Sequence, residues 1–225
     1  QNSSSLPATH FSSTYDRHEV INDERVNLIQ SGRTWFGDHF DAFIPSRTYS
    51  FNFPNRDVNK PVFIKTNVAA RSIGTDSHIE VDFNGATVLG GTITNVTGTF
   101  DRAYAHDTSP STFINPAGDA ATLVFTYNGV GNAKAWLNYI EANARCHLVY
   151  GGGQLFFRDK ESFGSGNVAV FTIANGANTT IWDVTDPVNV KAQSVSISGN
   201  DAKFKVAANS LLQYVAFTNS TVLGN

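Results

Sequence analysis

The sequence contains one cysteine, no methionine and few charged residues. A single cysteine, Cys146, excludes an internal disulfide and every zinc site built from several cysteines. For an exported protein, stability must then come from burial alone. Because no initiator methionine is present, we expect Gln1 to be a cleaved N-terminus or the start of a fragment.

Charge of one sign and long apolar runs are also missing. A net charge of −3, with only 16% charged residues, provides no basic surface that would attract nucleic acid. No apolar run approaches the roughly 18 residues of a membrane span. The first ten residues lack the basic and apolar regions of a signal peptide. Nucleic acid and a membrane span are therefore not expected.

Aromatic and β-branched residues are abundant instead. The chain has 17 Phe and 7 Tyr beside many Val, Ile and Thr residues, which favour strands over helices. Strand-like segments separated by turn residues follow one another at 33–37, 48–53, 61–70, 78–83, 86–93, 120–129, 133–150, 154–159, 167–174, 179–185, 190–198, 202–207 and 211–218. This pattern predicts an all-β fold, an antiparallel, jelly-roll-like β-sandwich followed by a second, smaller β module.

Three local patterns carry most of this prediction. In segment 61–70, alternation places Val62, Ile64, Thr66 and Val68 on one face. Asn84-Gly85 predicts a two-residue hairpin turn between 78–83 and 86–90. Residues 129–131 suggest another hairpin-like connection, leading into 133–150. That segment fits either a helix or an alternating strand, and its neighbours favour the strand.

Glycines 151–153 are the predicted boundary between the two modules. They lack the following Lys-Ser/Thr and helix of a phosphate-binding loop, so a flexible connection is the better interpretation. We predict an extended N-terminal segment at 1–30, a β-sandwich module at 31–150, and a second β module with a C-terminal linker at 151–225.

Several phrases of the sequence resemble the PorU family, the sortases of the type IX secretion system of Bacteroidetes. They are SGRTWFGDHF (31–40), SFNF (50–53), AWLNYIEANAR (135–145), GGQLFFRD (152–159), IWDVTDP (181–187) and LLQYVAFTN (211–219). The resemblance covers about residues 11–219 and places the chain before a gingipain-type cysteine peptidase domain. It implies a non-catalytic accessory segment, with the nucleophile and its histidine lying beyond this chain.

The same resemblance implies the setting of the parent protein. That protein would be exported to the outer membrane surface, where it removes C-terminal sorting domains from secreted cargo and joins the cargo to an anionic lipopolysaccharide. The implied partners are the adjacent peptidase domain, other secretion-system components and the cargo. No catalytic residue of the family matches a position of this sequence, so we predict no catalytic or cofactor-binding residue.

Acidic residues and one thiol are the remaining candidates for chemistry. Cys146 and His147 are adjacent, and neighbouring strand residues project to opposite faces, so we expect a structural cysteine. Asp159, Asp183 and Asp186, together with Glu161, are candidate oxygen ligands for a structural calcium ion, although solvated turn acids are the expected interpretation. Glu141 and Asp159 are the nearest acids for a hydrolase with a carboxylate pair.

The tryptophans support an alternative function. Trp35, Trp136 and Trp182 could form a sugar-stacking platform, which would make the chain a carbohydrate-binding module of a secreted bacterial protein. Each lies in an apolar strand pattern, however, so we expect burial in the core. The Asn-x-Thr triplets at Asn95, Asn178 and Asn219 are expected to be chance occurrences in a bacterial protein.

Overall fold

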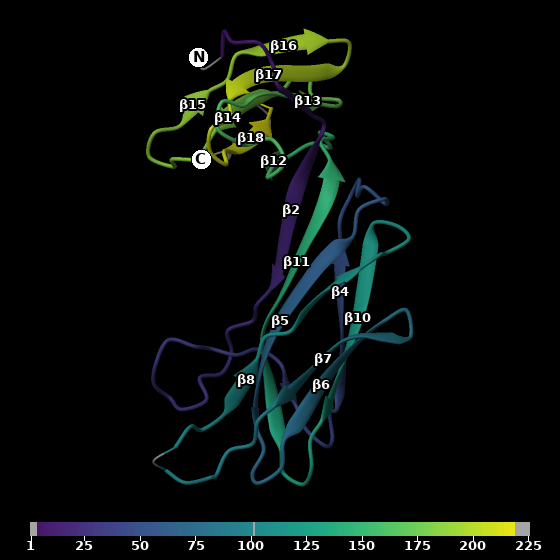
Figure 1. Ribbon diagram of the computed structural model, residues 1–225, viewed down its shortest axis with the longest axis vertical. Coiled ribbons are helices and arrows are strands. Elements are labelled where there is room, and N and C mark those ends of the chain that lie inside the picture. The colour runs from purple at the N-terminus through teal and green to yellow at the C-terminus, as the bar shows by residue number, and fades with distance from the viewer. Residues whose placement is uncertain (1–3, 101, 219–225) are drawn as a thin grey trace. The chain divides into compact units, whose positions relative to one another are not determined.

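The computed structural model describes residues 4–100 and 102–218, and its regular elements are all strands (Figure 1). The chain divides into two compact units. The larger unit comprises His18–Phe53 and Val58–Ala144, and the smaller unit comprises Gln1–Arg17, Pro54–Asp57 and Arg145–Asn225. The described residues include no helix with the length and apolar character that crossing a membrane would require.

The larger unit contains two sheets. One is four-stranded, in the order β4 (Ser46–Asn52), β10 (Ala120–Asn128), β6 (Ser77–Phe83), β7 (Ala86–Ile93). The other has the order β2 (Thr14–Ile21), β11 (Lys134–His147), β5 (Val62–Arg71), β8 (His106–Thr108), with β3 (His39–Phe40) paired to β11 and β9 (Ser111–Ile114) paired to β5. Strands β2 and β11 each contribute residues to both units.

The core of the larger unit follows the predicted alternation. Val62, Ile64, Thr66 and Val68 are all fully buried, as expected for one face of β5. Fully buried side chains of the other sheet complete this core, among them Ile79, Leu123 and Phe125. The antiparallel all-β sandwich predicted from the sequence is thus confirmed.

The Asn84-Gly85 hairpin is confirmed as well. Phe83 of β6 lies directly opposite Ala86 of β7, which leaves two residues in the loop. Asn84 has a φ of 53° and Gly85 a φ of 77°, so both adopt the left-handed conformation that a type I′ turn requires.

Three local predictions are wrong. Segment 190–198 is not one strand, because it forms β15 (Lys191–Ala192) and β16 (Val195–Ser198), which belong to different sheets. Segment 33–37 is not a strand, because only Phe36 pairs, in an isolated bridge to Val26. The connection at 129–131 does not form a hairpin either. Both edges of β10 are already taken, by β4 and β6, so the chain crosses to the other sheet before β11 begins.

Segment 133–150 forms the strand β11, as predicted, but its alternation is interrupted by a β-bulge. Leu137 pairs with Val68 and Tyr139 pairs with Asn67, which leaves Asn138 as the extra residue. The bulge shifts the inward-facing positions by one, so that Ile140 and Ala142 are buried after Leu137. The predicted alternation therefore holds only as far as Leu137.

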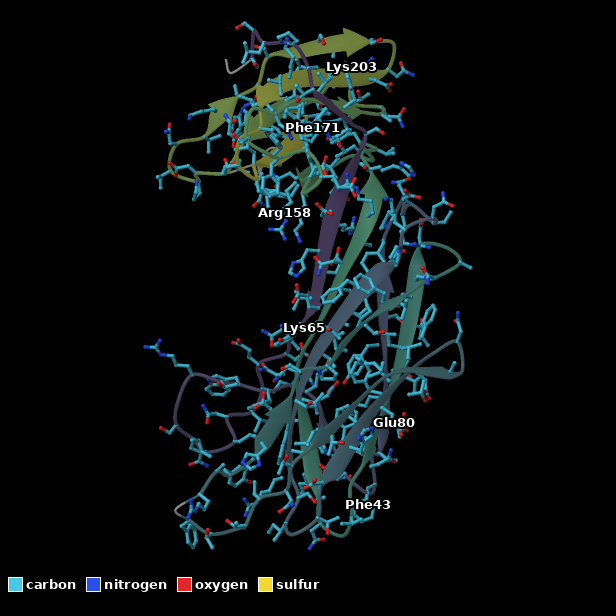
Figure 2. All side chains as sticks on the ribbon, in the orientation of Figure 1. Phe43, Lys65, Glu80, Arg158, Phe171 and Lys203 are labelled. Atoms are coloured by element: carbon cyan, nitrogen blue, oxygen red, sulfur yellow. The ribbon has the colours of Figure 1, made fainter. Side chains whose placement is uncertain are left out.

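The smaller unit contains two further four-stranded sheets. Their orders are β1 (His10–Ser12), β13 (Val168–Ile173), β17 (Asp201–Ala207), β16 (Val195–Ser198), and β12 (Gln154–Arg158), β18 (Gln213–Phe217), β14 (Thr180–Asp183), β15 (Lys191–Ala192). Four buried rings, from Phe157, Phe171, Phe204 and Tyr214, form the aromatic core between them. Phe171, labelled in Figure 2, lies 5.0 Å from Phe204 and 5.4 Å from Tyr214 between ring centroids.

The bounds of the compact units differ from the predicted modules at 31–150 and 151–225. The smaller unit begins at Arg145 in its last segment and also includes β1, which lies in the segment predicted to be extended. Strand β1 joins this unit by parallel pairing with β13, where His10 lies opposite Ala169. Independent folding of residues 151–225 stays a prediction.

Candidate functional site

A hollow of about 480 Å³ lies in the larger unit, beside the bulge of β11. We name it the Asn67 hollow. Asn67 of β5, Asn138 and Tyr139 of β11, and Asp107 of β8 contribute to its lining, together with Tyr104 and residues of the loop 27–36. Its volume is that of a small-molecule site.

Asn67 is the centre of a hydrogen-bond network in this hollow. Its side chain is only 7% exposed. The Nδ2 group donates to Asp107 Oδ2 at 2.7 Å and to Ser109 Oγ at 2.7 Å, while Oδ1 accepts a hydrogen bond from Asn138 Nδ2 at 2.9 Å. These bonds fix the orientation of both amides and of the Asp107 carboxylate.

The chemistry of the Asn67 hollow suits binding better than catalysis. Amide, hydroxyl and carboxylate groups stand beside the tyrosine rings, an arrangement that can recognise a polar ligand with a flat face. His106 Nδ1 lies 3.1 Å from the carbonyl oxygen of Thr94. Among the described residues that line the hollow, no hydrogen bond joins a nucleophile to this histidine, as a nucleophile and its general base would require.

The sequence interpretation missed the Asn67 hollow, although one signal was available. Asparagine is depleted in strands, yet Asn67 and Asn138 both occur within segments that were correctly predicted to be strands. A polar amide in such a segment indicates a bulge, a buried network or a site. Their pairing across β5 and β11 needs the register, which the sequence does not supply.

Asp159, a candidate calcium ligand expected to be a solvated turn acid, is instead buried and bound by an arginine. In the smaller unit Arg145 Nη1 lies 2.7 Å from Asp159 Oδ1 and 3.3 Å from Asp16 Oδ1, and Arg145 Nη2 lies 3.5 Å from Glu161 Oε2. Arg145 is 8% exposed and Asp159 is 1% exposed. Burial disfavours the charged guanidinium, but the hydrogen bond and the charge of Asp159 outweigh it and raise the pKa of Arg145.

The other candidate calcium ligands make local bonds; Asp183 is the buried last residue of β14, and Asp186 lies in the loop that follows. Asp183 Oδ1 accepts a hydrogen bond from the backbone of Thr185, and Asp186 Oδ1 accepts one from the backbone of Val188. Both are the local side-chain bonds for which aspartate is favoured in turns. Over the described ranges, no group of three or more His, Cys, Asp or Glu side chains is arranged to hold a metal ion.

The thiol and the carboxylate pair have separate surroundings. Cys146 is buried, whereas the neighbouring His147 is exposed. Glu141 belongs to the larger unit and lies 3.0 Å from His18 Nε2; its pKa is lowered by a hydrogen bond from Asn143 and by His18. Asp159 belongs to the smaller unit, where Arg145 binds it.

The tryptophans do not share one environment. Trp136 is 8% exposed, as predicted for a core residue, but Trp35 is 44% exposed and Trp182 is 40% exposed. For these two residues the prediction of burial is wrong. Trp182 alternates with the buried Ile181 and Asp183 on β14 and so points outward, and Trp35 lies in the segment that forms no strand.

The glycine run and the Asn-x-Thr triplets occupy ordinary positions. Gly152 and Gly153 have positive φ angles and open space around them, in the connection before β12. Asn95 bonds to Asp76 through its backbone and side-chain nitrogens, and this bonding lowers the pKa of Asp76. Asn178 lies in the turn before β14, and Asn219 lies outside the described residues.

Comparison with known proteins gives one informative likeness. No family model and no curated protein matches the chain. Among solved structures, the chain is similar to dimeric latent PorU from Porphyromonas gingivalis, with a TM-score of 0.81 and 18% sequence identity. The match covers 98% of this chain and 22% of that chain. It shows that the fold is that of a region of PorU, in agreement with the resemblance found in the sequence.

Proposed function

We propose that this chain is a non-catalytic accessory region of a type IX secretion system sortase of the PorU family. One observation carries the proposal: nearly the whole chain has the fold of about a fifth of PorU. The order of the sequence phrases shared with that family supports it independently. In this role the parent protein is a cysteine endopeptidase whose catalytic domain follows the present chain.

The proposed role is to position the peptidase domain and to contact cargo or other components of the secretion machinery. The parent protein is then exported and lies at the outer membrane surface. The related solved structure is described as latent. Shielding of the peptidase site before maturation is therefore a further part of the proposed role.

The coding sequence that follows the codon for Asn225 provides the first test. We expect it to continue into a peptidase domain with its own cysteine and histidine. A stop codon directly after Asn225 in the natural gene would contradict the proposal.

The second test incubates the purified 225-residue chain with a peptide reporter of a C-terminal sorting domain. No cleavage is expected, and turnover by this chain would refute a non-catalytic role.

A carbohydrate-binding module is the second candidate function. The specific observation in its favour is the Asn67 hollow, where amides and a carboxylate stand beside tyrosine rings, together with the partly exposed Trp35 and Trp182. A glycan array probed with the chain tests this function. Binding that is lost in Asn138→Ala and kept in Trp182→Phe would assign it to the hollow, and absence of binding to every glycan would reject it.

A further inference from the structure

Two basic residues lie directly opposite each other on neighbouring strands of the larger unit. Arg71, the last residue of β5, pairs with Lys134, the first residue of β11. Side chains opposed in this way have Cβ atoms about 4.5–5.5 Å apart, and like charges at such positions destabilise a sheet. The next pair on the same face is Ala69 with Trp136, which is buried against Phe36, so both cations share one face with a tryptophan.

Neither cation has a carboxylate partner among the described residues. Arg71 Nη1 donates to the carbonyl oxygen of Tyr104 at 2.7 Å, and its guanidinium lies 4.5 Å from the centroid of the Tyr104 ring. Lys134 forms no ion pair within 4 Å in the described ranges. Its charge helps to lower the pKa of Asp41, but the backbone hydrogen bonds of Ile44 and Phe43 contribute most to that shift.

Some other basic residues of the same unit have an acidic residue beside or opposite them. Arg25 and Arg47 share Asp38, at 3.1 Å and 3.6 Å. Lys65, labelled in Figure 2, lies directly opposite Glu141 across the same two strands that carry Arg71 and Lys134. The sheet thus places an acid opposite a base at one position of β5 and β11, and a base opposite a base at another.

The two unpaired cations line a hollow of about 540 Å³, which we name the Arg71 hollow. Tyr104, Trp136 and Ile73 form its aromatic and apolar wall, and the turn 130–133 completes it. Among the described residues, no acidic side chain lines it. Tyr104 is 41% exposed, so its ring is accessible to a ligand.

We propose that the Arg71 hollow binds a small acidic ring compound, with its oxyanion between Arg71 and Lys134 and its ring against Tyr104 and Trp136. A carboxylate or phosphate group would relieve the repulsion between the two cations and accept charge-assisted hydrogen bonds from both. The planar guanidinium can donate two parallel bonds to such a group, and the ammonium supplies a point charge. The inference goes beyond the accessory role and does not depend on it.

A fluorescence titration of the 225-residue chain tests this binding. In a Trp35→Phe, Trp182→Phe background, Trp136 is the only tryptophan and reports on the hollow. The probes are glucuronate and glucose 6-phosphate, which separate a carboxylate source from a phosphate source, with glucose as the neutral ring and inorganic phosphate as the bare anion. We expect at least one acidic sugar to bind tenfold more tightly than glucose and than inorganic phosphate.

Two variants decide whether Arg71 carries the binding. Arg71→Gln should weaken binding of the acidic sugar by tenfold or more, whereas Lys60→Gln, at a lysine that does not line the hollow, should leave it unchanged. Equal affinities for glucose and the acidic sugars overturn the role of the anion. Absence of binding at millimolar concentrations of both acidic sugars overturns the site.

Thermal unfolding supplies a second readout that does not rely on ligand identity. At low ionic strength, Lys134→Gln removes repulsion, so its Tm should equal or exceed that of the parent chain. Lys65→Gln removes an attraction to Glu141, so its Tm should fall. The rise in Tm caused by the acidic sugar should be lost in Lys134→Gln and retained in Lys65→Gln. A lowered Tm for Lys134→Gln would show a structural ion pair and overturn the proposal.

Discussion

Tyr214 and Tyr49 are both buried tyrosines, but their hydroxyl groups have different surroundings. Tyr49 Oη donates a hydrogen bond to Asp38 Oδ2 at 3.0 Å. Tyr214 Oη is buried without a hydrogen-bond partner in the described part of the chain. Burial raises the pKa of both hydroxyls, and the charges of Asp38 and Asp183 add to the increase for Tyr49 and Tyr214, respectively. A buried hydroxyl that lacks a partner costs about 1–3 kcal/mol.

The first prediction contrasts the removal of these two hydroxyls. Tyr214→Phe should raise the free energy of unfolding by about 1 kcal/mol at neutral pH, because it removes an uncompensated polar group and keeps the ring. Tyr49→Phe should lower it by about 1–2 kcal/mol, because it removes a bond to a carboxylate. Urea denaturation of both variants measures the two effects. A loss of stability in Tyr214→Phe would contradict the assignment.

The second prediction concerns the buried ion pair of the smaller unit. Arg145→Met leaves the Asp159 carboxylate buried without its cation, and we expect a loss of about 3–5 kcal/mol in the free energy of unfolding. Adding Asp159→Asn to Arg145→Met should recover part of this loss, because the stranded charge is then gone. Arg33→Met, at an exposed arginine, is the control and should change stability by less than about 0.5 kcal/mol.

At the residue scale, the sequence predicted which face of a strand is buried better than it predicted the surroundings of single side chains. The fully buried positions of β5 follow from alternation, because burial of one face is a property of the strand itself. The exposure of Trp182 and the pairing of Asp159 with Arg145 do not follow from it. Both depend on which segments lie beside them in space, and a tryptophan on β14 can point to either face.

Strands β6 and β7 are joined by the Asn84-Gly85 turn, which the sequence specifies most directly. Gly85 has a φ of 77° and nothing within 4 Å of the position that a Cβ would occupy. A side chain at Gly85 therefore meets no neighbour, and the whole effect of a substitution must come from the backbone conformation.

The third prediction follows from this dependence on the backbone conformation alone. Gly85→Ala should lower the free energy of unfolding by about 1–2 kcal/mol, since an L-residue is disfavoured in the left-handed region. Gly118→Ala is the matched control, because Gly118 also has open space but no positive φ, and its effect should be under about 0.5 kcal/mol. Equal effects of the two substitutions in thermal unfolding would show that φ at Gly85 is not the cause.

Apart from the β6–β7 hairpin, the pairing of strands was less predictable than their existence. The segment 133–150 contained β11, but the bulge at Asn138 inverted its later alternation. The bulge lies beside Asn67, whose side chain accepts a hydrogen bond from Asn138, and Thr66 Oγ1 donates to the carbonyl oxygen of Tyr139. The connection at 129–131 has hairpin chemistry and still crosses between sheets, because the neighbours of β10 are decided by β4 and β6 rather than by the turn.

The smaller unit is assembled from three separate stretches of chain. Its last stretch includes Leu148, which is buried, and the carbonyl oxygen of Leu148 accepts a hydrogen bond from Ala174 at 2.9 Å. Its first stretch supplies β1, which lies beside β13 in parallel. A fragment that starts at the glycine run lacks both of these contributions.

The fourth prediction applies to that fragment. Residues 151–225 alone should unfold at lower urea concentration than the smaller unit of the whole chain, or fail to fold, because a short chain with an incomplete core has little stability to lose. Residues 1–17 joined through a glycine linker to 145–225 are the control and should regain cooperative unfolding. Circular dichroism during urea titration measures both. Equal midpoints for the two fragments would support the module boundary predicted at 151–153.

At the scale of the whole molecule, the sequence predicted the fold class and the likeness to a PorU region, and the structure agrees with both. The bounds of the compact units could not be read from glycine content. A discontinuous unit has no continuous signal in the sequence, since the four residues 54–57 join it only through spatial neighbours such as the backbone of Arg145.

The pairing of β1 with β13 has a consequence for the order of events during folding. Thr9 Oγ1 bonds to the carbonyl oxygen of Val168, a partner 159 positions later in the chain. During synthesis β1 must therefore wait without its partner until β13 has been made. Closing so long a loop is entropically costly and slow. Strand β1 thus emerges before β13 and is held only after it, so completion of the smaller unit reports that the polypeptide as far as β13 has been made.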